Sequence, residues 1–168
     1  MKEVYFEMEE SNSSFFKELL GAKSQLIYSD RFIKQFGENN IEASYFIVSL
    51  NKGTGIRVSS SWFECEETID DYYLLAAEKV NFSVEENPSI FSFENQSILS
   101  GVSVLSRSFS DNDVIITCDF GILIEREDKK KVCFVGGESA FQNVVLIDDA
   151  NQIDELINSD QVVIKPIS

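Results

Sequence analysis

The chain has 168 residues, 43% of them hydrophobic, with 29 Asp and Glu against 14 Lys and Arg. This length fits one domain with a sizeable core, and the apolar share excludes an intrinsically disordered chain. The net charge of −15 argues against direct binding to nucleic acid or anionic membranes, because both need basic patches. We expect a single domain over residues 1–168 that is suited to basic protein partners.

The cysteines and the N-terminus predict a cytoplasmic protein. The chain has an odd number of cysteines: Cys65, Cys118 and Cys133. They lie far apart and have neither metal-ligand nor CxxC spacing, which is typical of reduced, buried thiols. The first ten residues contain four glutamates, which argues against a signal peptide. No apolar run approaches the roughly 20 residues of a membrane span.

Two short helices are expected in the first forty residues, after a strand or extended arm over 4–8. The first has apolar residues at helical spacing before a glycine stop: Phe15, Phe16, Leu19, Leu20 and Gly21. The second begins with Asp30 as its N-cap and has an apolar face at Phe32, Ile33 and Phe36.

From Ile41 the hydrophobic period changes from 3.6 to 2. Alternating apolar and polar residues predict a strand over 41–48, and residues 51–55 contain two glycines that favour a turn. A second strand follows from Ile56 to Glu66. The pattern therefore predicts a β-hairpin.

A third helix is predicted at about 68–80. Thr68 and Asp71 match the capping box loosely, and Lys79 near the other end suits the helix dipole. The apolar residues at helical spacing are Ile69, Tyr72, Tyr73, Ala76 and Val80.

The C-terminal half is rich in strand signals. Val114–Arg126 is apolar on both faces, which predicts a central strand that forms a hairpin with 131–135. A fourth helix is expected after Asp149, and Pro166 makes 162–167 an edge strand. Strands over 98–110 and 144–147 complete the prediction: an α+β domain, mostly antiparallel sheet with about four short helices packed against it.

The chain contains no histidine, which removes Ser-His-Asp and Cys-His nucleophiles and His-ligated zinc. No phosphate-binding or nucleophile motif occurs, and we expect no catalytic residue, cofactor or metal site. The best candidate for a catalytic carboxylate is Asp119, because an apolar strand face could raise its pKa. The favoured interpretation is that Asp119 caps a backbone group or marks the solvent side of the strand. Asp111–Asp113 is interpreted as a turn and not as a calcium site.

The most acidic window runs from Glu64 to Glu86, where eight acidic residues and one basic residue give a charge of −7. Interface hot spots favour Trp and Tyr, and surrounding charges steer association. The predicted partner-binding residues are Trp62, Glu64, Glu66, Glu67, Asp70, Asp71, Tyr72 and Tyr73. The alternative is that the tyrosines belong to the core stripe of the helix and the acids are only solvated.

In size, charge, composition and lack of catalytic motifs, the chain resembles the small acidic immunity proteins that neutralise bacterial toxins, including those of contact-dependent growth inhibition systems. The acids beside Tyr72 and Tyr73 also look like the toxin-binding helix of colicin nuclease immunity proteins, a family that is much shorter and all-helical. The resemblance implies an inhibitor that binds a basic toxin, for example a nuclease. The alternatives are a nucleic-acid mimic that blocks a DNA-binding or defence protein, and a carboxylate-based hydrolase.

Overall fold

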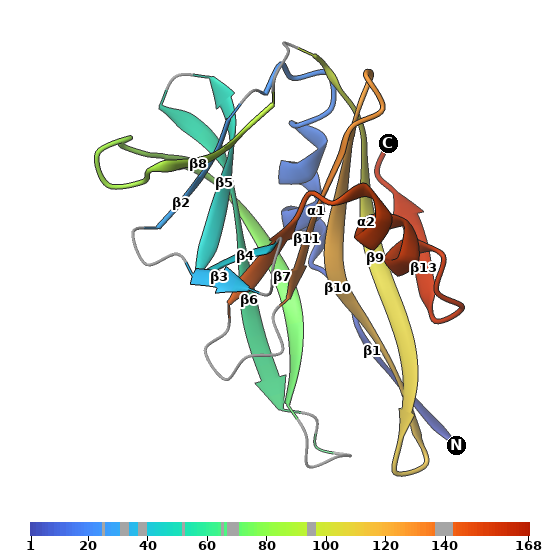
Figure 1. The fold of residues 1–168 in the computed structure, drawn as a ribbon. Coiled ribbons are helices and arrows are strands. Elements are labelled where there is room, and N and C mark those ends of the chain that lie inside the picture. Colours follow the sequence, from blue (N-terminus) through green and yellow to red (C-terminus); the bar gives the residue numbers. More distant parts are fainter. Residues whose placement is uncertain are drawn as a thin grey trace.

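In the computed structural model the chain forms two β-sheets packed face to face, with two short helices (Figure 1). The structure describes residues 1–24, 26–30, 34–36, 40–51, 53–64, 66, 71–93, 97–136 and 143–168. For residues 34–36, 62–64 and 71–73 it describes the backbone alone.

The first sheet is built around one long strand, β10 (Val114–Arg126). β9 (Leu99–Asp111) pairs with β10 along its whole length on one side. On the other side β10 pairs with β1 (Lys2–Phe6), which is parallel to it, and with β11 (Lys131–Gly136). The prediction of a central strand is confirmed, and two apolar faces suit a strand that is covered on both sides.

The remaining strands of this sheet are β12 (Val144–Ile147), β4 (Asn40–Ala43), β3 (Lys34–Phe36) and β13 (Val162–Pro166). Their order is β13-β9-β10-β11-β12-β4-β3, so β13 lies at one edge. The edge position predicted from Pro166 is confirmed. Its physical reason is that a proline has no backbone N–H and cannot donate a ladder hydrogen bond to a further strand.

The second sheet contains β2 (Leu26–Ser29), β5 (Tyr45–Asn51), β6 (Thr54–Glu64), β7 (Asp71–Asn81) and β8 (Ser89–Ser92). Its order is β7-β6-β5-β2-β8, and every pair is antiparallel. The hairpin predicted from the turn at 51–55 is confirmed as β5–β6.

The strand predicted over 41–48 is two strands that belong to different sheets. The chain bends at Ser44, between β4 and β5. The buried Asp30 carboxylate binds this corner, because its Oδ2 accepts hydrogen bonds from the backbone N of Ser44 at 3.2 Å and from the Ser44 hydroxyl. Asp30, predicted as a helix cap, therefore stabilises the point where the chain changes sheet.

The main core lies between the two sheets. It joins Phe46, Ile56 and Leu75 of the second sheet to Ile122 and Phe134 of the first, and all five side chains are fully buried. α1 (Glu10–Lys17) adds Phe16 to this core. At about 25 cal/mol per Å² of apolar area, each such side chain contributes roughly 1.5–3 kcal/mol.

A β-bulge redirects the side chains of β10. The pairing with β9 shifts between Asp119 and Gly121, which inserts one residue and reverses the alternation of faces. Cys118 and Phe120 therefore pack in a smaller outer cluster, whereas Ile122 and Ile124 lie in the core between the sheets. Strict alternation along an unbroken strand would place all four on one face.

The outer cluster is covered by α2 (Ala150–Ile157), which contributes the fully buried Ile153. Asp149 is the N-cap of α2, and its carboxylate accepts a hydrogen bond from the backbone N of Gln152 at 2.9 Å. The predicted helix after Asp149 is confirmed. Within the described residues, neither helix has the length and hydrophobicity needed to cross a membrane.

The predicted fold class, α+β with about four helices, is wrong. The described chain is mostly β-strand and contains only α1 and α2 as α-helices. The helix predicted after Asp30 includes Lys34–Phe36, which is β3, and the helix predicted at 68–80 covers most of β7. Residues 31–33 and 68–70 of these predictions lie outside the described residues.

Candidate binding surface at the tip of the β6–β7 hairpin

The residues predicted to bind a partner lie on a β-hairpin and not on a helix. β6 and β7 pair in register from Thr54 opposite Asn81 to Glu64 opposite Asp71. A helix would have set Tyr72 and Tyr73 about 100° apart on its surface. Strand pairing instead sets Tyr73 opposite Trp62 and Tyr72 opposite Phe63. The question of which tyrosine lies on the outer side of a helix therefore does not arise.

The outer part of this hairpin extends beyond its neighbouring strand. β5 begins at Tyr45, opposite Ser59, so its pairing with β6 ends five residues before β6 does. Residues 60–64 of β6 are thus paired with β7 alone among the described strands. Figure 1 shows this end of the hairpin pointing toward the same end of the molecule as the N-terminus and the β9–β10 turn.

Acidic residues are concentrated at the hairpin tip. Glu64 and Asp71 are directly opposite in the register, and Glu66 is exposed in the connection between the strands. The sequence contains no Lys or Arg between Arg57 and Lys79. The described acidic residues of the tip are Glu64, Glu66 and Asp71, and the sequence has Glu67 and Asp70 between them.

The rest of the acidic window does not contribute to this surface. Glu78 forms an ion pair with Arg57 on β6, and Lys79 pairs with Glu18 after α1 at 2.8 Å. Glu85 and Glu86 follow the far end of β7, roughly 33 Å along the strand from Asp71. The net charge of −7 predicted for one surface is therefore divided between two ends of the hairpin.

The structure brings most of the predicted site residues together and leaves others untested. Trp62, Glu64, Asp71, Tyr72 and Tyr73 share the last three register positions of the hairpin. Glu67 and Asp70 lie outside the described residues. Phe63 was not among the predicted contacts, although it is the register partner of Tyr72. The adjacent aromatic pairs Trp62-Phe63 and Tyr72-Tyr73 were the signal for such pairing, because aromatic residues favour strands.

The carboxylate of Asp119, the candidate catalytic residue, binds a backbone amide near the N-terminus and a lysine side chain near the C-terminus. The residue is 3% exposed. Its Oδ2 accepts a hydrogen bond from the backbone N of Met8 at 2.7 Å, and its Oδ1 accepts one from Lys165 Nζ at 2.5 Å. Of the two alternatives in the favoured interpretation, the cap of a backbone group is confirmed, with an ion pair in addition. The solvent-side alternative is wrong, because the side chain is buried.

The two described cysteines are buried, as the sequence predicted. Burial raises the pKa of the Cys133 thiol to about 12. Burial also raises the pKa of Cys118, although the nearby Arg107 guanidinium acts in the opposite direction. Both thiols therefore hold their protons near neutral pH, which suits a structural role. Cys65 lies outside the described residues.

In the part of the chain that the structure describes, no three Cys, Asp or Glu residues are grouped so as to hold a metal ion. No protein-family model matches the chain, and no curated protein or solved structure is significantly similar to it. The resemblance to immunity proteins thus stays a hypothesis from the sequence.

Proposed function

We propose that this protein binds a basic protein partner through the tip of the β6–β7 hairpin and neutralises it, as immunity proteins neutralise toxins. The observation that carries the proposal is the register of the hairpin. It sets two pairs of aromatic residues and the Glu64–Asp71 pair at one end of a two-stranded ribbon, beside an acidic connection.

The tip combines two features that interfaces use. Aromatic residues supply large contact areas, and Trp and Tyr are enriched among the residues that dominate binding energy. The stretch between Arg57 and Lys79 has acidic residues and no Lys or Arg, and such a charge attracts a basic surface and accelerates its association. A toxin that acts on nucleic acid must itself carry a basic, concave site for phosphates. A narrow acidic hairpin could occupy such a site and exclude the substrate.

Charge reversal at the tip tests this proposal. The variant carries Glu66→Lys, Glu67→Lys, Asp70→Lys and Asp71→Lys. A control variant carries the same four-residue reversal at exposed positions elsewhere: Glu86→Lys, Glu127→Lys, Glu155→Lys and Asp160→Lys. The two variants have the same net charge, so a difference between them reports the location of the charges and not their sum.

The measurement is affinity capture from the native cell lysate at low salt, followed by mass spectrometry and by binding kinetics with the protein captured. We expect wild type and control to retain one basic protein, and the tip variant to associate with it at least about tenfold more slowly. Added salt should slow the association of wild type. Equal association of the two variants with that protein would overturn the proposed surface. Retention of many unrelated DNA-binding proteins, released by DNA, would favour the nucleic-acid mimic.

A further inference from the structure

The first sheet has a polar, exposed surface on the side where the two sheets pack together. Near the β10–β11 loop this side of the sheet lies in the core, where Val104 and Ile122 are register partners. Beyond the β-bulge of β10 the same side continues toward the β9–β10 turn. Seven residues of β1, β9, β10 and β13 lie there, each exposed or only partly buried: Glu3, Tyr5, Ser108, Ser110, Ile115, Thr117 and Val163. We call these residues the open face.

Two residues of the open face offer apolar contact area to a partner. Tyr5 is 58% exposed and Val163 is 59% exposed. The Tyr5 hydroxyl donates a hydrogen bond to the Glu3 carboxylate at 2.6 Å, which restrains the ring on the sheet. The hydroxyls of Ser108 and Thr117 pair with each other at 2.7 Å. A restrained aromatic ring loses less freedom on binding, so the open face is preorganised as a contact surface.

The electrostatic potential of the open face is negative around Tyr5. The hydrogen bond to Glu3 and the charge of Glu3 raise the pKa of the Tyr5 hydroxyl, and desolvation and the charge of Glu7 act in the same direction. None of the seven residues is a Lys or Arg, and the nearby Lys165 binds Asp119 at 2.5 Å. A basic surface therefore complements the open face.

The open face lies at the same end of the molecule as the hairpin tip. Figure 1 shows the N-terminus and the β9–β10 turn at the end toward which the tip points. By strand alternation, positions 62 and 73 belong to the same row of the hairpin as Val58 and Ala77, whose side chains lie in the core. This row therefore continues past the core on the side of the hairpin that is turned to the first sheet.

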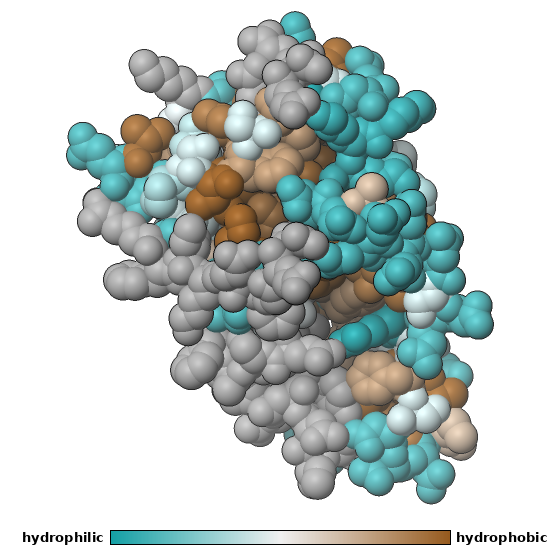
Figure 2. Space-filling view, viewed as in Figure 1, coloured by the Kyte–Doolittle hydropathy of each residue, from teal (hydrophilic) through white to brown (hydrophobic). Residues whose placement is uncertain are grey.

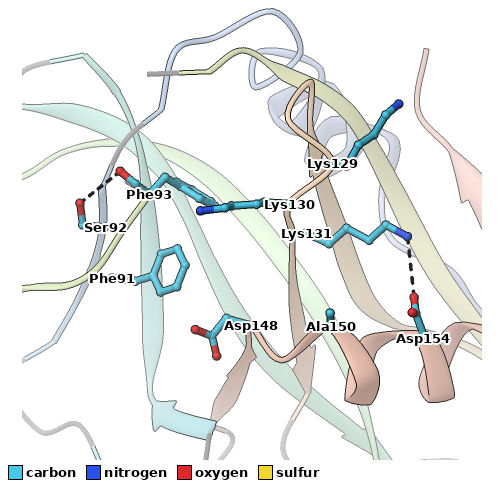
Figure 3. A pocket seen from close by; sticks show the side chains of 9 residues that line it. All are labelled: Phe91, Ser92, Phe93, Lys129, Lys130, Lys131, Asp148, Ala150 and Asp154. Atoms are coloured by element: carbon cyan, nitrogen blue, oxygen red, sulfur yellow. Dashed lines mark hydrogen bonds and ion pairs between the residues drawn. The ribbon is translucent and has the colours of Figure 1, made fainter. Parts of the chain in front are cut away.

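The opposite end of β10 has charges of both signs. Lys129–Lys131 lie beside Asp148 and Asp154 around a cavity of about 510 Å³ (Figure 3). The charged atoms of Lys131 and Asp154 are 3.9 Å apart. Figure 2 shows hydrophilic residues over α2 and the β10–β11 loop. Because opposite charges lie close together there, their attraction for a basic partner is weakened, whereas the open face and the tip have acidic residues without basic ones.

We propose that the basic partner bound at the hairpin tip also packs on the open face, so that its binding site has two parts on different sheets. Tyr5 and Val163 contact apolar groups of the partner, and Glu3 faces one of its basic side chains. This inference rests on the proposed function, because it assigns a second contact area to the same partner. It also gives the β-bulge a role, since the bulge turns the apolar side of β10 away from the second sheet at this end.

The probe is a dodecapeptide amide in which arginine and threonine alternate. In an extended conformation its arginines lie along one side, so it stands in for a basic surface. Amide NMR titrations at low salt should show shifts at residues 64–71 of the tip and at the open face, and none in α2. A control peptide with glutamate in place of arginine should shift neither surface.

Two substitutions place a cation on the open face: Tyr5→Arg in β1 and Val163→Arg in β13. Val84→Arg is the matched control, because Val84 is 62% exposed in the connection between β7 and β8, outside the open face. The three variants have the same net charge. We expect Tyr5→Arg and Val163→Arg each to weaken binding of the arginine peptide about fivefold, because like charges repel at an interface, and Val84→Arg to weaken it less than about twofold.

Two kinds of result separate this inference from the proposed function. Shifts at the tip without shifts at the open face, shifts in α2 as large as those of the open face, or equal weakening by the three arginine variants would overturn the inference alone. Absence of shifts at the tip would overturn both. The two open-face variants lie in different strands, so if urea denaturation shows that one of them does not fold, the other decides.

Discussion

Two buried carboxylates bind backbone amide groups where strands end. Asp30 holds Ser44 at the break between β4 and β5, and Asp119 holds Met8 just after β1. A buried amide without a partner costs about 1–3 kcal/mol, so these acids have a structural use that composition alone does not reveal. Asp119, the carboxylate that looked most suited to catalysis, is one of the two that satisfy the backbone.

The raised pKa of Cys133 predicts a loss of stability at alkaline pH. In the folded protein the thiol keeps its proton up to pH about 12, whereas in the unfolded chain it titrates near 9.0. The unfolded state therefore binds fewer protons above pH 9, and the free energy of unfolding falls by about 1.4 kcal/mol per pH unit until pH 12. The full contribution of this thiol is present below pH 9.

Cys133→Ala should remove this dependence. Urea denaturation at pH 7 and pH 10.5 should show wild type losing about 2 kcal/mol more than the variant over that interval. The cavity left by the substitution lowers the stability of the variant by the same amount at both pH values, and Cys118 is present in both proteins. An equal decline of the free energy of unfolding in the two proteins would contradict a raised pKa of Cys133.

At the scale of elements, β7 shows why local pattern misidentified a strand. Residues 74–79 are Leu-Leu-Ala-Ala-Glu-Lys, which are good helix formers, and Asp71 loosely suits a capping box. In the structure this segment pairs with β6 along its whole length, and Leu75 and Ala77 alternate into the core. Pairing and burial outweigh intrinsic propensity, which differs by only about 0.7 kcal/mol per residue among ordinary residues.

The close approach of β5 and β6 makes Gly55 intolerant of a side chain. A Cβ atom added there would lie 2.6 Å from Ile47 Cγ2 and 2.7 Å from the backbone O of Val48. Because a backbone oxygen in a sheet cannot move aside, the two strands would have to separate. We expect Gly55→Ala to lower the free energy of unfolding by about 1–3 kcal/mol in urea denaturation.

Gly101→Ala is the matched control, because Gly101 also lies within a strand. The nearest atom to its added Cβ is Glu125 Oε2 at 3.2 Å, which is the end of a flexible side chain. This variant should be as stable as wild type or slightly more stable, since alanine restricts the unfolded chain. If both variants lost the same stability, the steric explanation for Gly55 would fail.

At the scale of the whole molecule, Asp119 ties both ends of the chain to the central strand. One carboxylate oxygen binds the N-terminal segment at Met8 and the other binds β13 through Lys165. We expect Asp119→Ala to cost about 1–3 kcal/mol, because it leaves the Met8 amide without its acceptor. Asp119→Asn should cost less, since its amide oxygen can still accept that hydrogen bond.

Amide hydrogen exchange measures whether this loss is local to the chain ends. In Asp119→Ala the amide of Met8 and those of β1 and β13 should exchange faster, whereas the protection of β6 should fall only by the global loss of stability. Wild-type stability and exchange in Asp119→Ala would refute this role.

Only part of the candidate site was predictable. The acidic and aromatic residues are contiguous in the sequence, so composition found them. Their arrangement was not predictable, because Tyr73 and Trp62 are brought together by a strand register that a helical pattern hides. A cavity lined by Phe91, Lys130 and Asp148 gave no local signal either, since these residues come from three separate segments.

The sequence by itself determined the features that depend on neighbouring residues: the charge of −15, the lack of histidine, the β5–β6 turn, the N-cap of α2 and the edge position of Pro166. Only the tertiary structure decided that β7 is a strand, that the chain changes sheet at Ser44, and that a bulge reverses the faces of β10. Caps and turns are governed by interactions within a few residues. Strand pairing joins distant segments, and its hydrogen bonds and buried area outweigh weak local preferences.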